Sequence, residues 1–269
     1  MDLTSFANQI RICALELCYR SRSSHIGGSF SVADILAALY GDVLSIDPAN
    51  ATDPARDRLY YSKGHASAAL YAALSIRGFF DVDSLIAGFG SDGSYFTSHI
   101  NHQIPGVELS TGSLGHALGV ACGAALAAKR RDAHHSVFTI LSDGELDEGS
   151  SWEAILFASH LQLDNLIAIV DYNKIQSFGT VADVMGLEPL AEKFRAFNWI
   201  VEEVNGHDLG PLTEALKFAK KSRTGRPKCV VAHTIKGKGV SFMENLLAWH
   251  YKSPNETEYR NALKELSGT

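Results

Sequence analysis

The sequence has no long apolar run, no excess of basic residues and few cysteines. No stretch approaches the roughly 20 apolar residues that a membrane-spanning helix needs, so we expect no contact with a membrane. Lysine and arginine number 24 against 30 acidic residues, which gives a formal net charge of −6. This balance argues against a nucleic-acid partner, because phosphate backbones are bound by basic faces. Local fields, rather than net charge, decide whether a small anionic ligand binds.

The four cysteines, Cys13, Cys18, Cys122 and Cys229, include no C-x-x-C pair. Three of them lie in apolar helix or strand patterns, which is typical of buried free thiols in a reducing compartment. The first 20 residues form an amphipathic pattern without the basic start and apolar core of a signal peptide. We therefore expect a cytoplasmic protein.

The first third of the 269 residues is predicted to be mainly helical. Apolar spacing near 3.6 covers residues 3–20, a second helix is capped by Ser31, and a third covers residues 63–78. Residues 88–113 are polar and irregular, and this length favours a functional segment or a lid over a simple connector. A helix rich in Gly and Ala follows, and its small side chains favour close packing in the core or at a subunit contact.

From residue 136 onward the pattern changes to strands that alternate with helices. Short β-branched apolar runs occupy residues 136–141, 165–171, 199–204 and 228–234. Helical patterns separate them, at residues 147–162, 187–197 and 211–222. This alternation predicts an α/β fold with a mostly parallel central sheet and helices on both faces. Ligands of such sheets bind beyond the carboxyl ends of the strands.

Asp143 and Asn173 each end an apolar run, at the same edge of this predicted sheet. Their oxygens, with the backbone carbonyl of Ile175, suit a hard cation such as Mg²⁺ that keeps phosphate oxygens in its shell. Gly144 allows close approach of an anion, and a helix beginning near Asp147 directs free N–H groups toward it. Asp-Gly is also a common turn dipeptide, so the prediction depends on the strand–helix–strand pattern between the two residues.

The motif "SDGELDEGSSWEA…DYNKI" resembles the Gly-Asp-Gly…Asn fingerprint of thiamin-diphosphate enzymes of the transketolase family. Four further segments resemble that family in the same order, namely "SSHIGGSFSVADILAALY", "YSKGHASAALYAAL", "PGVELSTGSLGHALG" and "TIKGKGVSFMENLLAWH". The resemblance implies a thiamin-diphosphate-binding fold in which residues 1–269 form one diphosphate-binding (PP) domain. Ser142 stands where many relatives have glycine. This difference leaves the metal ligand Asp143, the next residue, in place.

The resemblance implies the roles of individual residues. Asp143, Asn173 and the Ile175 carbonyl would hold Mg²⁺ (or Ca²⁺ or Mn²⁺). His25 and His99 would face the substrate, whereas His65 and His250 would lie nearer the diphosphate. The other implied contacts to thiamin diphosphate are Gly112, Ser113, Leu114, Gly144, Glu145 and Lys236.

Three other histidines have less support from the motifs. His102 is an alternative to His99, and the role of His116 stays open because many relatives carry glutamine there. His233 matches no motif, and we interpret it as structural.

Glu148 and Glu153 fit two interpretations. Acidic residues at the start of a helix are favoured by the helix dipole alone. In the family, the matching glutamates lie at the subunit contact and share protons between two active sites.

The family's pyrimidine-binding and C-terminal domains find no counterpart before the sequence ends at residue 269. We therefore expect a separate C-terminal transketolase subunit, in an α2β2 assembly. The resemblance implies transfer of a two-carbon ketol unit from a ketose phosphate to an aldose phosphate through a carbanion held on the cofactor.

Two other interpretations are carried forward. One is that the chain is the first subunit of a 2-oxo-acid dehydrogenase, because that subunit also contains a Gly-Asp-Gly…Asn motif. The second is a non-catalytic regulatory protein that binds Mg-diphosphate. A dinucleotide-binding dehydrogenase is disfavoured, because no G-x-G-x-x-G follows a predicted strand.

Overall fold

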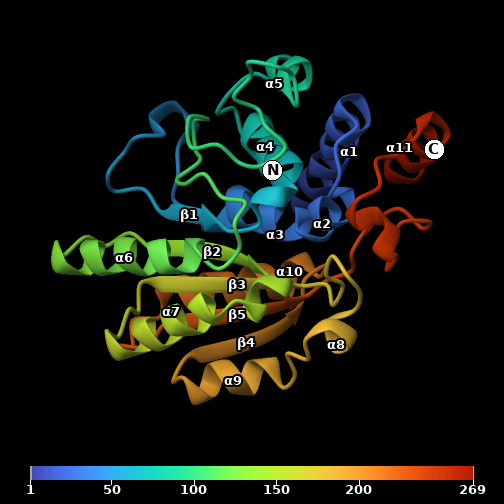
Figure 1. Cartoon of the computed structure of the whole chain (residues 1–269). Helices are drawn as coiled ribbons and strands as arrows, with labels where there is room; N and C mark the ends of the chain where they lie inside the picture. Colours follow the sequence, from blue (N-terminus) through green and yellow to red (C-terminus); the bar gives the residue numbers. More distant parts are fainter. Residues whose placement is uncertain (1, 269) are drawn as a thin grey trace.

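The computed structural model describes residues 2–268 and is built around one parallel sheet (Figure 1). Its five strands lie in the order β1-β2-β3-β5-β4, and every neighbouring pair is parallel. The strands are β1 (Arg58–Tyr61), β2 (Val137–Ser142), β3 (Leu166–Tyr172), β4 (Ile200–Asn205) and β5 (Lys228–His233). The predicted α/β fold with a parallel sheet is therefore confirmed.

Helices cover both faces of the sheet. One layer contains α1 (Leu3–Ser21), α2 (Ile26–Ser31), α3 (Ala33–Ala38), α4 (Ser67–Ile76), α5 (Val82–Gly88), α10 (Leu209–Lys221) and α11 (Glu256–Ser267). The other contains α6 (Ala117–Arg130), α7 (Gly149–His160), α8 (Val181–Val184) and α9 (Leu190–Ala196). Successive residues of β3 enter opposite layers, because Ile167 and Ile169 pack in the first core and Ala168 and Val170 in the second. Burial on both faces explains why the central strands read as continuous apolar runs.

The sequence reading was wrong at several element boundaries. The strand β1 and the helices α5 and α11 were not predicted. Ser31 ends α2 instead of capping a helix, and its hydroxyl donates to Asp171 at 2.6 Å. The third helix begins at Ser67, after a short 3-10 turn. Of the segment predicted to be irregular, residues 88–113, all but the first residue are irregular, because Gly88 ends α5.

Within residues 2–268, no helix has both the length and the hydropathy to cross a membrane. All four cysteines are free thiols; Cys13 is half-buried and the other three are buried. The predicted free thiols are therefore confirmed.

A buried ionic cluster ties the first helices to the far end of the sheet. The Arg11 guanidinium on α1 pairs with Asp34 on α3, and both side chains are 8% exposed. Nδ1 of His207, after β4, lies 2.6 Å from the Asp34 carboxylate. His207 Nε2 accepts the N–H of Ile235 at 2.8 Å. Asp34 thus joins α1 and α3 to the loops that follow β4 and β5.

Removing this shared carboxylate should destabilise the chain strongly. We expect Asp34→Ala to lower the free energy of unfolding by about 3–5 kcal/mol, because it leaves Arg11 buried without its partner. Urea unfolding measures the change. Asp42→Ala is the matched control, because Asp42 pairs with Lys217 at a side chain 43% exposed, and such surface pairs contribute at most about 1 kcal/mol. Equal losses in the two variants would contradict the role of the cluster.

Candidate active site

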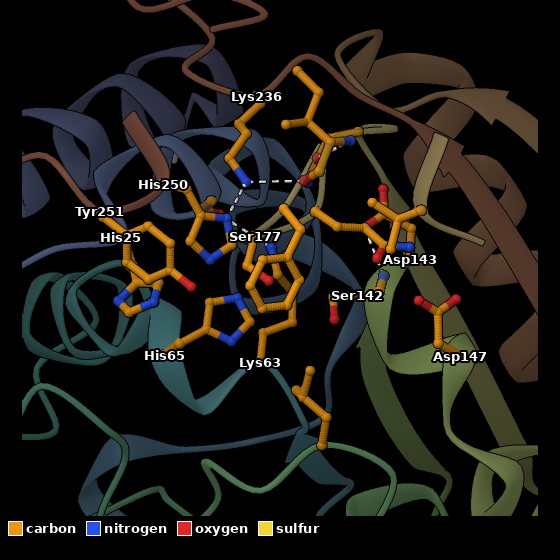
Figure 2. A pocket seen from close by; sticks show the side chains of 18 of the residues that line it. His25, Lys63, His65, Ser142, Asp143, Asp147, Ser177, Lys236, His250 and Tyr251 are labelled. Carbon is orange, nitrogen blue, oxygen red and sulfur yellow. Dashed lines mark hydrogen bonds between the residues drawn. The ribbon is translucent and has the colours of Figure 1, made fainter. Parts of the chain in front are cut away.

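A cavity of about 410 Å³ lies beyond the carboxyl ends of β1, β2, β3 and β5 (Figure 2). Parallel strands bring the residues that follow them to one edge of the sheet, where crossover loops leave a crevice. The loops after these strands supply Lys63, Asp143, Asn173 and Lys236 to its wall. Segments from the first layer and from the irregular loop 89–113 complete it. The cavity therefore lies where the sequence predicted a ligand site.

Asp143 is a buried carboxylate whose hydrogen bonds, within residues 2–268, come from backbone amides. It is 2% exposed, and its two oxygens accept the N–H groups of Gly144 at 2.8 Å and Lys174 at 2.6 Å. Burial, and then the nearby charge of Asp171, raise the pKa of the Asp143 carboxyl. Among the salt bridges of residues 2–268, none involves Asp143. A buried acid without a salt-bridge partner fits a site that receives a cation.

Asn173 and Ile175 surround the same place from the end of β3. Asn173 is 5% exposed, and its side-chain oxygen accepts the Ile175 N–H at 3.1 Å. Lys174 between them has a φ of 66°, a left-handed conformation that non-glycine residues rarely adopt. Such local strain is common at functional sites, and here it accompanies the turn that carries the Ile175 carbonyl.

Lys236 already places a positive charge beside these oxygens. Its ammonium donates to the Ile175 carbonyl at 3.0 Å and to His250 Nδ1 at 2.8 Å, as the dashed lines in Figure 2 mark. Burial lowers the Lys236 pKa, and the Asp143 charge opposes that shift. No group of three or more His, Cys, Asp or Glu side chains suited to a metal occurs in residues 2–268. A cation held here would take one carboxylate, one amide oxygen and one carbonyl from the chain and the rest from its ligand, which fits a metal–diphosphate.

Four histidines gather at the other end of the cavity. The His25 ring centroid lies 5.2 Å from that of His65, 5.1 Å from His250 and 6.1 Å from His99. His25 has a φ of 70°, its N–H donates to the His250 carbonyl at 2.9 Å, and its Nδ1 lies 2.7 Å from Ser24 Oγ. The four histidines that the sequence singled out therefore share one cluster.

The environment holds three of these imidazoles neutral at pH 7. Burial, then His99 and the two lysines, lower the pKa of His25 to about 4. Burial and Lys236 lower the pKa of His250 to about 3, and burial and Lys63 place that of His65 well below its usual value. Neutral imidazoles can both donate and accept hydrogen bonds.

The alternative His102 lies outside the cavity. His99 lines it and lies against Gly112, where an added Cβ would be 3.0 Å from the imidazole. His102 is exposed, and its Nδ1 lies 2.8 Å from Ser110 Oγ. His116 is exposed at the start of α6 and does not line the cavity.

Three residues that the resemblance assigned to the site do not line this cavity. Glu145 is fully buried, and it accepts hydrogen bonds from the Ser62 hydroxyl and from the Gly115 N–H at 2.9 Å. Ser113 is exposed on the loop before α6, and Glu153 is exposed on α7. Within this chain Glu145 therefore joins the segments behind the cavity wall through its hydrogen bonds. The other predicted site residues line the cavity: His25, His65, His99, Gly112, Leu114, Asp143, Gly144, Glu148, Asn173, Ile175, Lys236 and His250.

Sequence reasoning missed several other lining residues. Lys63 is 1% exposed and pairs with the fully buried Asp171 below the cavity, and its ammonium also donates to the Gly28 carbonyl at 3.1 Å. The sequence signal for Lys63 was its position in the "SKGH" segment, two residues before His65. Phe178 and Tyr251 are exposed aromatic residues at the cavity, 83% and 60% exposed. The sequence signal for both was their position, because Phe178 follows Ile175 by three residues and Tyr251 directly follows His250.

Comparison with known proteins identifies the class of this fold and site. The family model described as "Transketolase, thiamine diphosphate binding domain" matches residues 3–268. The chain therefore belongs to the transketolase family, in its thiamin-diphosphate-binding domain.

Individual relatives fall into two groups by length. A 6-deoxy-6-sulfo-D-fructose transketolase subunit from Clostridium sp. (strain MSTE9) is 42% identical over 99% of this chain and 96% of its own length. An apulose-4-phosphate transketolase subunit from Phocaeicola vulgatus is 37% identical over 99% of this chain and 94% of its own length. The solved transketolase of Campylobacter jejuni superposes with a TM-score of 0.92 at 33% identity, over 98% of this chain and 42% of its own. The chain thus spans about two fifths of such a transketolase and nearly all of the proteins named as subunits.

The neutral histidine cluster predicts acid sensitivity of the ligand-free chain. An unfolded histidine takes up a proton near pH 6.5, whereas folded His25 has its pKa lowered to about 4, so stability falls as the pH drops through this window. We expect His25→Asn to reduce the loss of melting temperature between about pH 7.5 and pH 5 by at least about 2 °C.

Thermal unfolding of matched variants isolates this effect. The raised pKa of Asp143 has the opposite effect, because it increases stability as the pH falls. Each variant is therefore compared with the wild type at both pH values. His102→Asn is the control, because His102 is exposed outside the cavity. An acid loss in His25→Asn as large as in the wild type would contradict the burial argument.

Proposed function

We propose that this chain is the N-terminal, thiamin-diphosphate-binding subunit of a two-component transketolase. The enzyme would transfer a two-carbon ketol unit from a ketose or ketose phosphate to an aldose. The observation that carries this proposal is the single cavity in which the Asp143 and Asn173 oxygens face a cluster of histidines. The relatives named as subunits match this chain over 94–96% of their own length, which supports a separate partner.

The oxygen-rich end of the cavity fits the cofactor's diphosphate and metal. Asp143, Asn173 and the Ile175 carbonyl would hold Mg²⁺, and the ammonium of Lys236 beside them would face the diphosphate. When bound, thiamin diphosphate supplies a nucleophilic carbon and an electron sink for the ketol unit. His65 would lie on the diphosphate side, and Gly112 and Leu114 would contact the rings.

The histidine end of the cavity suits the reacting sugar. His25 and His99 line it, and the neutral imidazole of His25 can accept or donate a proton at a hydroxyl group. The histidine end offers no free cation to a phosphate, because Lys63 pairs with Asp171 and the ammonium of Lys236 bonds to the Ile175 carbonyl at the oxygen-rich end. The phosphate group of a sugar phosphate would then be bound outside this cluster, on the partner subunit.

The outer face of α6 and α7 offers a surface for such a partner. Leu156 and Phe157 on α7 and Val120 on α6 are 57%, 43% and 43% exposed. Gly119 and Gly123 leave open space between them on α6. Exposed large apolar side chains on neighbouring helices are typical of protein contacts. Glu148 and Glu153, exposed at the start of α7, would come to lie at this contact.

The first test is ketol transfer with and without the partner. We expect the purified chain alone to transfer no measurable ketol unit from xylulose 5-phosphate to an aldose. Addition of the pyrimidine-binding transketolase subunit of the same organism should restore transfer in the presence of thiamin diphosphate and Mg²⁺. Normal transfer by the chain alone would refute the two-component proposal. Release of CO₂ from a 2-oxo acid by the complex, without ketol transfer, would instead favour a 2-oxo-acid dehydrogenase.

A pair of substitutions separates the two ends of the cavity. We expect Asp143→Ala to weaken Mg²⁺-dependent binding of thiamin diphosphate at least about a hundredfold, because it removes the only carboxylate ligand. His25→Ala should leave that affinity within about threefold and lower kcat by about a hundredfold or more, because it removes a proton-transfer group. Titration calorimetry and steady-state kinetics of the complex measure both quantities. Unchanged affinity in Asp143→Ala would contradict the metal assignment, and a large loss in His25→Ala would move His25 to the diphosphate end.

A further inference from the structure

Tyr251 is an aromatic residue at the histidine end of the cavity to which the reaction has so far assigned no role. It follows the 3-10 turn η5 (Leu247–His250), and its side chain lines the cavity. Its ring centroid lies 4.7 Å from that of His250 and 5.9 Å from that of His25. Figure 2 shows the phenol beside His25 and His65, with its hydroxyl directed toward the interior. Tyr251 therefore lies against His25, which is proposed to face the sugar, and against His250.

The fold itself makes little use of this side chain. Tyr251 is 60% exposed, so its ring adds little to the core. Buried tyrosines of this chain use their hydroxyls for structure, as Tyr61 does toward the Ala66 carbonyl at 3.2 Å and Tyr172 toward Glu188 at 2.8 Å. No such partner for the Tyr251 hydroxyl occurs in the described part of the chain. The group is thus free to bind a ligand in the cavity.

The groups around Tyr251 are suited to ligands that carry hydroxyl groups. The ammonium of Lys63 is paired with Asp171, and that of Lys236 is bonded to the Ile175 carbonyl and His250. The imidazoles next to Tyr251 are hydrogen-bonding groups without a full charge. A phenol adds one donor and one acceptor, and its ring gives an apolar surface for C–H groups. Such a set matches the hydroxyl groups of a sugar better than it matches a phosphate.

We propose that Tyr251 is a substrate-specificity residue whose phenol hydrogen-bonds a sugar hydroxyl beyond the reacting carbonyl. This inference rests on the proposed transketolase function. The substrate class is a short polyhydroxylated aldehyde, or the ketose formed from it, with a hydroxyl group next to the reacting carbon. Tyr251 contacts the substrate in this role and leaves the metal–diphosphate end unaffected.

The test compares two aldehyde acceptors of equal length in the assembled two-subunit enzyme. D-Glyceraldehyde carries hydroxyl groups on its second and third carbons, and propanal carries none. With saturating xylulose 5-phosphate as donor, Tyr251→Phe should lower kcat/KM for D-glyceraldehyde about tenfold, mainly through KM. The kcat/KM for propanal should stay within about twofold of the wild type, because propanal has no hydroxyl group that could bond to the phenol of Tyr251.

Controls distinguish a substrate contact from a structural effect. Tyr95→Phe removes a phenol of similar exposure, 57%, that does not line the cavity, and it should leave both acceptors unchanged. Tyr251→Phe should keep the wild-type affinity for thiamin diphosphate, the melting temperature and the affinity between subunits.

Each alternative outcome has a distinct meaning. Equal changes for the two aldehydes, no change for either, or weakened binding between the subunits would overturn the role of Tyr251 while leaving the proposed function in place. A wild-type complex that transfers no ketol unit to any acceptor would refute the proposed function, and this inference with it.

Discussion

The buried carboxylate of Asp171 holds the floor of the cavity together. It accepts hydrogen bonds from Ser31 on α2 at 2.6 Å, from Lys63 after β1 and from Thr234 after β5. Each donor comes from a different segment of the chain, and all of them meet at the end of β3. A carboxylate that is fully buried is costly unless it is paired and hydrogen-bonded. This requirement fixes the relative positions of the segments that carry the residues of the site.

The same ion pair sets the charges of the groups above it. After burial, Asp171 is the main cause of the raised pKa of Asp143, which leaves a carboxyl that gains most from a nearby cation. The ammonium of Lys63 contributes to the lowered pKa of His65, again after burial. One internal pair therefore helps to divide the cavity into an end that attracts a cation and an end of neutral hydrogen-bonding groups. The proposed function would use this difference, with the metal–diphosphate at one end and the sugar at the other.

The positions of Asp143 and Asn173 were predictable because the end of a parallel strand fixes where the next residue lies. Glu145 shows the limit of this reasoning. It is two residues from Asp143, but the 3-10 turn Gly144–Asp147 directs its side chain behind the wall, toward Ser62. β1 has only four residues and follows a loop rich in turn residues, so its periodicity was too short to detect. The pairing of Lys63 with Asp171, 108 positions apart, depends on the strand order, which no local pattern contains.

Helix α7 links the cavity to the exposed apolar surface. Glu148, the residue before α7, lines the cavity, whereas Leu156 and Phe157 on the same helix are exposed outside it. Gly115, in the loop before α6, lies directly against Glu148. A Cβ added to Gly115 would be 2.8 Å from the Glu148 Cβ, and the Gly115 φ of 81° also disfavours a side chain. A partner that covers α6 and α7 would therefore reach the cavity wall at Glu148.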